Sequence, residues 1–168
     1  MTPNDELNKE TEDAVYFFSA LCPLDNFSAH PVETWGKRFP TAEHAYQWKK
    51  FSGTAPAVAK SIFAVADPHR VKEISRIEAG VMDADWVGHR VAIMGAVVRA
   101  KVAQNEGVRE ALRATGRKTI IENSREDAFW GIGDGTGKNI MGNIWMEIRD
   151  EIFPVSLRSS RLYGFKKD

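Results

Sequence analysis

The chain has 168 residues, which suits one domain with one core, and its hydrophobic fraction of 43% is ordinary for a globular protein. Its 23 basic and 23 acidic side chains balance, which argues against a protein that coats DNA, because such proteins are usually basic. The single cysteine, Cys22, excludes an internal disulfide and indicates a reducing compartment.

The chain starts with the polar, acidic residues "MTPNDELNKETED". They contain almost nothing that folding would bury, which predicts a disordered tail over 1–13. They are also the reverse of a signal peptide, and no apolar run in the sequence approaches the ~20 residues that span a bilayer. We therefore expect a cytoplasmic protein with one domain over 14–154, no membrane partner, and a second tail over 155–168.

The first part of the domain predicts short strands that lead into a helix. "AVYFFSA" (14–20) is rich in aromatic residues, and "HPVETWGKRFP" alternates around Gly36 as a hairpin does. Pro40 and Thr41 then form a helix start signal for "AEHAYQWKKF". With Thr41 as the N-cap, Glu43 lies in the first turn of this helix.

The middle of the chain has helical spacing almost throughout. "APAVAKSIFAVA", "PHRVKEISRIEAGV" and "EGVREALRATG" each predict a helix, with Pro68 at a tolerated first position and Gly116 as a C-cap. The longest periodic segment is "DADWVGHRVAIMGAVVRAKVAQN". Its expected buried stripe consists of Trp86, Val87, Val91, Met94, Val98 and Val102.

The last part of the domain predicts one strand and one helix. "KTIIENS" is short and β-branched, as a strand is, and "NIMGNIWMEIRDEIF" has an isoleucine at every fourth position until Pro154 stops it. There is no internal repeat. The fold class that these elements predict is α+β and predominantly helical, in a single domain with a few short strands.

Five glycines gather in "SREDAFWGIGDGTGKNIMG", residues 124–142. The segment is not a Walker A loop, because Ile132 and Asn139 stand where that motif needs glycine and serine or threonine. It also lacks the spacing of a dinucleotide fingerprint, and Ile132 replaces the first glycine of the NAD and diacylglycerol kinase motif. Two interpretations remain: a loop whose backbone approaches an anion at a helix N-terminus, or a tight turn that only enters the last helix.

Metal and nucleophile chemistry have little support in the sequence. The four histidines are not at ligand spacing and none pairs with Cys22, so we expect no metal site and no cofactor. Cys22 is more typical of a buried apolar thiol, and there is no G-x-S-x-G elbow. An enzyme with this sequence would use carboxylates.

Three ordered segments resemble the motifs of the NADAR (YbiA-like) family. "NFSAHPVETWGKRFPTAEHAYQWKKF" is similar to its first motif, in which an N-F segment leads to G-K-x-[WF]-P-T-x-E-H at the start of a helix. "DADWVGHRVAIMGAVVRAKVAQNEGVREALRATG" looks like its middle motif. "IIENSREDAFWGIGDGTGKNIMGNIWMEIRDEI" resembles its third, E-x-S/T-x-x-D-x-x-W-G followed by glycines and a helix ending M-E-x-R. The resemblance covers residues 15–152 and implies one NADAR/YbiA-like domain.

The resemblance implies a metal-independent N-glycosidase without a cofactor. Members of its bacterial branch cleave the C–N bond of early riboflavin-pathway intermediates and release ribose 5-phosphate from a pyrimidine amine. Other members are similar to ADP-ribosyl hydrolases that remove ADP-ribose from guanine in nucleic acid. The expected partner is a phosphorylated ribosyl small molecule, with ADP-ribosylated nucleic acid as the alternative; a non-catalytic module that binds ADP-ribose or NAD, and a helical interaction protein, are further alternatives.

Cleavage of an N-ribosyl bond needs carboxylates, because positive charge builds on the sugar ring and water must be activated. The resemblance assigns the central role to Glu43, where the helix dipole would lower its pKa and keep it charged. Glu122 and Asp127 are five residues apart, and we expect them to be the supporting catalytic carboxylates. The alternatives are that Glu43 only stabilises its helix and that "ENSRED" is a solvated turn.

Substrate-binding residues are predicted by residue type at the matched positions. Trp130 and Trp86 are candidates to stack on a flat base, with core packing as the alternative, whereas Trp35, Trp48 and Trp145 are assigned to structure. The candidate phosphate contacts are Lys37, Arg90, Lys101 and Lys138, and each of them is otherwise a solvated surface charge. The remaining candidate contacts are Asn26, Gly131 and Asn139.

Overall fold

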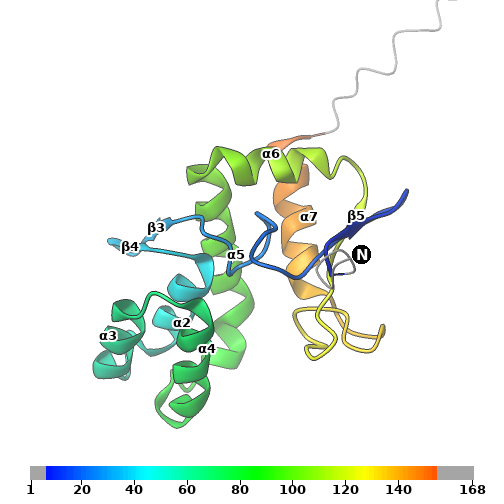
Figure 1. The fold of residues 1–168 in the computed structure, drawn as a ribbon. Coiled ribbons are helices and arrows are strands. Elements are labelled where there is room, and N and C mark those ends of the chain that lie inside the picture. Colours follow the sequence, from blue (N-terminus) through cyan, green and yellow to red (C-terminus); the bar gives the residue numbers. More distant parts are fainter. Residues whose placement is uncertain (1–6, 155–168) are drawn as a thin grey trace, which may run out of the picture.

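The computed structural model describes residues 7–154, and its strands form two small sheets (Figure 1). The middle strand β2 (Ala14–Phe17) pairs antiparallel with β1 (Lys9–Glu10) and parallel with β5 (Thr119–Glu122). β3 (Val32–Thr34) and β4 (Lys37–Phe39) pair antiparallel in a separate hairpin. The parallel register puts the C-terminal end of β5 beside the C-terminal end of β2, and both strands lead into loops there.

The hairpin that the sequence predicts around Gly36 is confirmed. Trp35 and Gly36 connect its two strands with φ angles of 50° and 70°. A two-residue hairpin turn of this kind requires positive φ at both positions, because its twist then matches that of the strands.

The helices lie at the predicted segments, so the α+β, mainly helical fold is confirmed. They are α2 (Ala42–Phe51), α3 (Pro56–Ala64), α4 (Pro68–Ile77), α5 (Trp86–Gln104), α6 (Glu106–Ala114) and α7 (Ile140–Ile152), with a 3₁₀ turn at Ala79–Val81. In Figure 1, α2, α3 and α4 gather on one side of α5, α6 crosses near its end, and α7 packs against both α5 and β5. Among the described residues no helix has the length and apolar character needed to cross a bilayer.

Thr41 caps α2 as the sequence predicts. Its backbone is extended and its side chain accepts a hydrogen bond from the His44 backbone N–H, which satisfies one of the free amides of the first turn. The imidazole of His44, which is fully buried, also contacts the Thr41 hydroxyl at 2.8 Å and the Val65 carbonyl at 3.0 Å. The first turn of α2, and with it Glu43, is therefore held in one place.

The predicted stripe of α5 is wrong for two of its residues. Val87 and Val91 are 64% and 39% exposed, whereas Trp86, Met94, Val97, Val98, Lys101 and Val102 are buried. At 100° per residue Val87 and Val91 lie on the same side of α5 as Met94 and Val98, so helical phase does not explain their exposure; the first turns of α5 are simply less covered there than the later ones. The isoleucine face of α7 is confirmed at Ile144 and Ile148, which are buried.

Trp145 on α7 has the structural role that the sequence assigned to it. It is fully buried and its indole N–H donates to the carbonyl oxygen of Leu24 at 3.1 Å. A buried tryptophan usually finds such a partner for its one polar atom. This contact ties α7 to the loop that follows β2.

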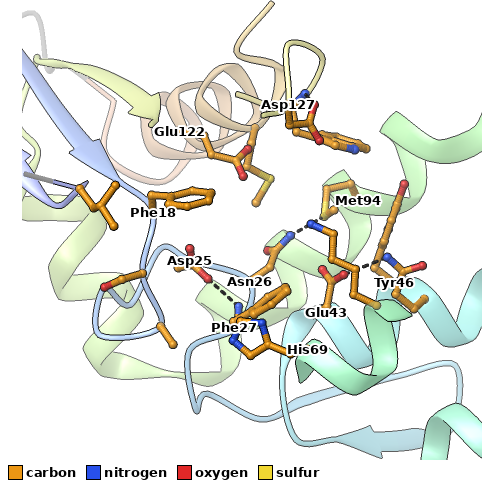
Figure 2. A pocket seen from close by; sticks show the side chains of 17 residues that line it. Phe18, Asp25, Asn26, Phe27, Glu43, Tyr46, His69, Met94, Glu122 and Asp127 are labelled. Carbon is orange, nitrogen blue, oxygen red and sulfur yellow. Dashed lines mark hydrogen bonds between the residues drawn. The ribbon is translucent and has the colours of Figure 1, made fainter. Parts of the chain in front are cut away.

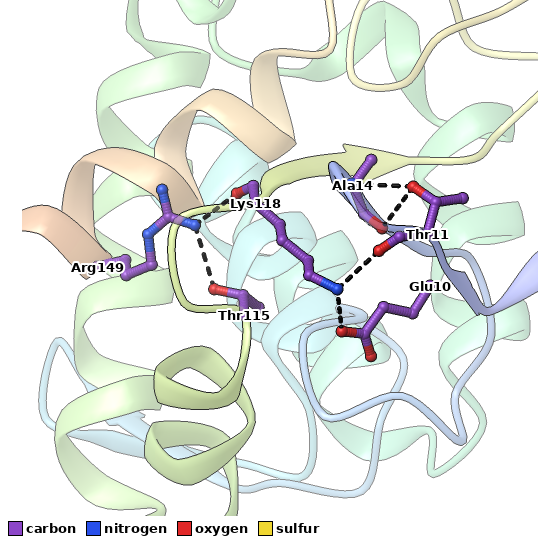
Figure 3. Close-up of polar contacts among 6 residues, drawn as sticks. All are labelled: Glu10, Thr11, Ala14, Thr115, Lys118 and Arg149. Carbon is purple, nitrogen blue, oxygen red and sulfur yellow. Dashed lines mark hydrogen bonds and ion pairs between the residues drawn. The ribbon is translucent and has the colours of Figure 1, made fainter.

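Residues 7–13 are not the disordered tail that their composition predicts. β1 adds to the edge of the sheet, and the Lys118 ammonium donates to the Glu10 carboxylate at 2.7 Å and to the Thr11 carbonyl at 2.6 Å (Figure 3). Arg149 supports this corner, since its guanidinium donates to the Lys118 carbonyl at 2.6 Å. The segment is held by backbone pairing and polar contacts rather than by apolar burial, so a criterion based on hydrophobicity fails here. Residues 1–6 and 155–168, the rest of the two predicted tails, lie outside the described residues.

Candidate active site

A cavity of about 460 Å³ lies where α2, α4, α5 and the loops after β2 and β5 meet (Figure 2). Five of the predicted site residues reach it from four separate parts of the chain. They are Glu43, Glu122, Asp127, Trp130 and Asn26. The other lining residues are Leu7, Phe18, Ser19, Ala20, Asp25, Phe27, Tyr46, Gln47, His69, Lys72, Met94 and Met141.

Glu43 enters the cavity from the first turn of α2. Its backbone N–H donates to the Asn26 carbonyl at 3.0 Å, and its side chain is buried. Gln47, one helical turn later, donates its amide N–H to the Glu43 carboxyl at 2.9 Å. Sequence reasoning missed Gln47, although its spacing of four residues from Glu43 places both on one face of the helix.

The pKa of Glu43 moves in the opposite direction from the one that the helix dipole predicts. Burial raises it, and the hydrogen bond from Gln47 and the charges of Lys72 and Lys50 offset the rise only in part. The desolvation of a fully enclosed carboxylate exceeds the effect of a helix end. A carboxylate whose pKa is raised is a stronger base than an exposed one, so the ionised form of Glu43 is suited to accept a proton from water.

Glu122 lies at the end of β5 and is held by Asn139. The Asn139 side chain accepts from the Glu122 backbone N–H and donates to the Ile120 carbonyl, both at 2.9 Å. Asn139 was predicted to contact substrate, but these two bonds occupy its amide, so it positions Glu122 instead. Burial, reinforced by the negative charges of Asp25 and Asp127, raises the pKa of Glu122 to about 8. At neutral pH the carboxyl of Glu122 is therefore mainly protonated and able to donate.

Asp127 and Trp130 are linked within one turn. One oxygen of Asp127 accepts from the backbone N–H groups of Phe129 at 2.9 Å and of Trp130 at 2.8 Å. The Trp130 ring meets the rings of Tyr46 and Phe129 edge-on, with centroids 5.8 and 5.0 Å away. Asp127 therefore fixes the backbone of the tryptophan that lines the cavity with it.

The glycine-rich segment is a packed turn and not an anion cradle. The backbone N–H groups of Gly133, Gly135 and Gly137 donate to carbonyl oxygens within the loop, so they are not free for a ligand. Gly131 was predicted to contact substrate, but a Cβ at this position would come within 2.8 Å of the Glu122 carbonyl. At Gly142 the same atom would lie 2.1 Å from the Ile120 carbonyl. These glycines allow the loop and α7 to approach β5 closely.

Three of the predicted phosphate contacts lie over aromatic rings and do not line the cavity. The charged group of Arg90 is 3.6 Å from the centre of the Phe129 ring, and Lys138 is 5.8 Å from the same ring. Lys37 lies 5.2 Å from the ring of Phe63. Cations pack in this way because the face of an aromatic ring is electron-rich.

Trp86 was a candidate to stack on a base, with core packing as the alternative. It packs in the core and does not line the cavity. Its side chain is 4% exposed, and its ring centroid lies 5.0 Å from that of Tyr46. It therefore supports the wall of the cavity from behind.

Lys101, the fourth predicted phosphate contact, is fully buried beneath the loop that carries Asp25 and Asn26. Its ammonium donates to the Asp25 carbonyl at 2.6 Å and to the Ser28 hydroxyl at 2.8 Å. Burial lowers the pKa of Lys101 to about 7. Lys101 therefore holds the loop in place rather than facing a ligand.

Replacing Lys101 with methionine is expected to change how the free energy of unfolding depends on pH. Because burial lowers the pKa of Lys101 from 10.5 to about 7, the unfolded chain binds this proton more tightly than the folded one. In the wild type this lysine makes stability rise with pH between those two values, by roughly 3 kcal/mol, and Lys101→Met lacks that rise. Urea unfolding from pH 7 to 10 measures the free energy of unfolding of the wild type and of Lys101→Met, and Lys60→Met, which replaces an exposed lysine, is the control. The same change of this free energy with pH in the wild type and in Lys101→Met would contradict the prediction.

The cation that does line the cavity is Lys72 on α4, together with His69 one turn before it. Sequence reasoning missed both, since a charged residue on a short polar helix is usually solvated. Asp25 was missed as well; burial raises its pKa, and the Phe27 backbone N–H donates to its carboxylate at 2.7 Å. Among residues 7–154, no three His, Cys, Asp or Glu side chains are grouped as metal ligands.

Three side-chain oxygens of the lining are buried without a hydrogen-bond partner among the described residues. One is Oε2 of Glu122, and the other two are the carbonyl oxygens of Asn26 and Gln47. Their amide nitrogens are engaged, that of Asn26 with the Met94 sulfur at 3.3 Å and that of Gln47 with Glu43. Buried acceptors of this kind are usually satisfied, so this side of the cavity suits a ligand that presents hydroxyl or amine hydrogens.

The chain is similar to known proteins along most of its length. The NADAR domain model matches residues 7–153. An N-glycosidase of Nostoc punctiforme is 33% identical over 143 residues, which cover 82% of this chain and 92% of that protein. N-glycosidase YbiA of Escherichia coli is 32% identical over 130 residues, 77% of this chain and 80% of YbiA.

A structure and a longer relative extend this similarity. The NMR structure of E. coli YbiA has a TM-score of 0.75 and 28% identity, covering 89% of this chain and 90% of YbiA. A riboflavin biosynthesis protein of Vibrio vulnificus is 35% identical over 130 residues, which are 77% of this chain but 35% of that protein.

Proposed function

The chain belongs to the NADAR domain family, and we propose that it hydrolyses the C–N bond between a phosphorylated ribose and a base-like amine, releasing ribose 5-phosphate. Its general activity is that of a hydrolase of N-glycosidic bonds, as its relatives from N. punctiforme and E. coli are named. The observation that carries the proposal is that Glu43, Glu122 and Asp127, from three elements of the fold, line one cavity with Trp130.

The two glutamates suit opposite proton transfers. Glu122, whose pKa is raised to about 8, donates its proton to the nitrogen that leaves. Glu43 in its ionised form accepts a proton from the water that attacks the anomeric carbon, as the C–N bond breaks. Exchange of these two protons with solvent restores the starting state. The negative charges of Glu43 and Asp127 stabilise the positive charge that develops on the ribose ring.

The lining has one lysine and no arginine among the described residues, which favours a single phosphate group. Lys72 supplies that charge, with His69 beside it on the same helix face. An ADP-ribosyl group would bring two linked phosphates to the same cavity. The small-molecule substrate, an early riboflavin-pathway intermediate, therefore fits better than ADP-ribosylated guanine, and the V. vulnificus relative is named for riboflavin biosynthesis.

Replacing Lys72 with methionine is expected to raise KM for the phosphorylated substrate about 10- to 100-fold, because one charge-assisted contact to phosphate is lost. The effect on kcat is expected to be smaller, since Lys72 contacts a part of the substrate that does not react. Steady-state kinetics measure both constants, and Lys60→Met, which removes an exposed lysine from α3, is the matched control. An unchanged KM in folded Lys72→Met protein would remove Lys72 from the phosphate site.

The proposed function is tested by incubating the purified protein with two substrates and identifying the products by mass spectrometry. The substrates are a 5-phosphoribosyl aminopyrimidine and ADP-ribosylated guanosine. We expect ribose 5-phosphate and the free amine from the first. Release of ADP-ribose from the second alone would favour the alternative hydrolase. Tight calorimetric binding of ADP-ribose without turnover of either substrate would indicate a binding module.

A further inference from the structure

The side of the cavity formed by residues 18–20 contains the aromatic ring of Phe18, which has no role in the proposed reaction. The Phe18 side chain points into the cavity (Figure 2), yet 39% of the residue is exposed. Among the described residues no aromatic ring packs against it, unlike Trp130, which Tyr46 and Phe129 contact edge-on. Phe18 therefore presents an apolar face that no other ring of the described residues covers, in a cavity that also contains the rings of Trp130, Tyr46 and Phe27 and several carboxyl and amide groups.

The position of Phe18 is set by Asn8, from the N-terminal segment. The Asn8 side-chain oxygen accepts from the backbone N–H groups of Phe18 at 2.9 Å and of Ser19 at 3.3 Å. Its amide nitrogen donates to the Ser19 hydroxyl at 2.5 Å. One side chain thus fixes two consecutive residues of the cavity wall. The preceding residue, Leu7, lines the same wall and accepts a hydrogen bond from Asn123 at 3.3 Å through its carbonyl oxygen.

Asn8 is itself anchored because the residues after it are tied to the domain. Lys9 and Glu10 pair with Tyr16 and Val15 across the β1–β2 ladder. At the far end of the segment, Lys118 holds Glu10 and Thr11 (Figure 3). The segment 7–11 is therefore fastened at two places, by Asn8 at the cavity and by Lys118 away from it.

We propose that Phe18 is a specificity-determining residue that stacks on the flat face of the substrate's base, and that Asn8 is its positioning residue. The proposal rests on the proposed function for the identity of the substrate. The contact of an aromatic face with water is weak, whereas a planar base that covers the Phe18 ring adds stacking energy to binding. A ligand that lacks the base has nothing to stack on Phe18, and this difference makes the role measurable.

The test compares two ligands, one with a base and one without. Isothermal titration calorimetry gives Kd for cytidine 5′-monophosphate and for ribose 5-phosphate, and steady-state kinetics give KM and kcat for the 5-phosphoribosyl aminopyrimidine. Phe18→Ala is expected to weaken binding of the nucleotide and to raise KM roughly 10-fold, with ribose 5-phosphate binding unchanged. Asn8→Ala is expected to give the same pattern with a smaller, about 5-fold, effect, because the ring remains but is no longer fixed.

Two control variants separate positioning from stability. Asn8→Asp keeps an oxygen that accepts from both backbone N–H groups, so it is expected to bind both ligands as the wild type does. Lys118→Met removes the contacts to Glu10 and Thr11 but keeps the β1–β2 pairing and the hydrogen bonds of Asn8, so it is expected to lower the melting temperature while leaving the ratio of the two Kd values unchanged. Circular dichroism and thermal melts establish that each variant is folded.

Two results would overturn the proposal. One is a folded Phe18→Ala protein that binds the nucleotide as the wild type does. The other is an equal loss for the nucleotide and for ribose 5-phosphate, which would mean a general change of the cavity. A wild-type protein that hydrolyses no N-ribosyl substrate would refute the proposed function instead, and the calorimetric comparison would still decide the role of Phe18.

Discussion

Replacing Glu43 with glutamine is expected to lower kcat about 1000-fold in a protein that remains folded. The substitution keeps the size of the side chain and an oxygen that accepts from Gln47, which donates to Glu43 at 2.9 Å in the wild type. It removes the charge that stabilises the ribosyl cation and the base that takes a proton from water. Release of ribose 5-phosphate under saturating substrate is the measurement.

The stability of Glu43→Gln distinguishes a lost catalytic group from a lost structural one. Burial raises the pKa of Glu43 from its ordinary value of 4.5, so the folded protein binds the proton more tightly than the unfolded chain. Wild-type stability therefore falls as pH rises from the unfolded pKa through the folded one, and the variant lacks this loss. We expect its melting temperature at pH 7 to equal or exceed that of the wild type. Full activity in this folded variant would show that Glu43 has no catalytic role.

Replacing Glu122 with glutamine is expected to lower kcat about 100-fold and to change the pH profile. A catalytic acid works only while it is protonated, and the pKa of Glu122 is raised to about 8. Wild-type activity should therefore decline as pH rises through about 8, because the proton that the leaving nitrogen needs is lost. The residual activity of Glu122→Gln should lack this decline.

Asp127→Asn tests the role of the Glu122 carboxyl in a second way, by changing its surroundings and not the group itself. An asparagine oxygen can accept the two turn hydrogen bonds that Asp127 accepts from Phe129 and Trp130, so the turn is expected to survive. The negative charge of Asp127 contributes to the raised pKa of Glu122. Its removal should shift the basic limb of the profile to lower pH. If the limb stays in place in Asp127→Asn and persists in Glu122→Gln, another group is responsible for it.

The elements of this fold could be predicted because their signals are local. Thr41 caps α2, Gly36 allows the hairpin turn, and the isoleucines of α7 repeat at helical spacing, each within a few neighbouring residues. The candidate carboxylates could be predicted from motif and residue type, and the cavity does contain Glu43, Glu122 and Asp127.

The predicted cations were not brought to the cavity, because the direction of a lysine or arginine side chain depends on the surface it packs against. Lys101 points inward beneath the cavity loop, while Lys72, on a helix with no distinguishing pattern, reaches the cavity. The direction in which a pKa shifts also depends on residues that are distant in sequence. Desolvation by residues distant in sequence raises the pKa of Glu43, although its place on the helix predicts the opposite.

The sequence by itself determined the family, the order of the helices and strands, and the carboxylates around which a reaction can be proposed. These depend on spacing and on side-chain type, which are written along the chain. Only the tertiary structure decided which residues share the cavity, that burial raises the pKa of both Glu43 and Glu122, and that the polar segment 7–13 forms part of the domain. Those properties arise from burial and from contacts between separate segments of the chain, such as Asn8 with Phe18, Asn139 with Glu122 and Lys101 with Asp25.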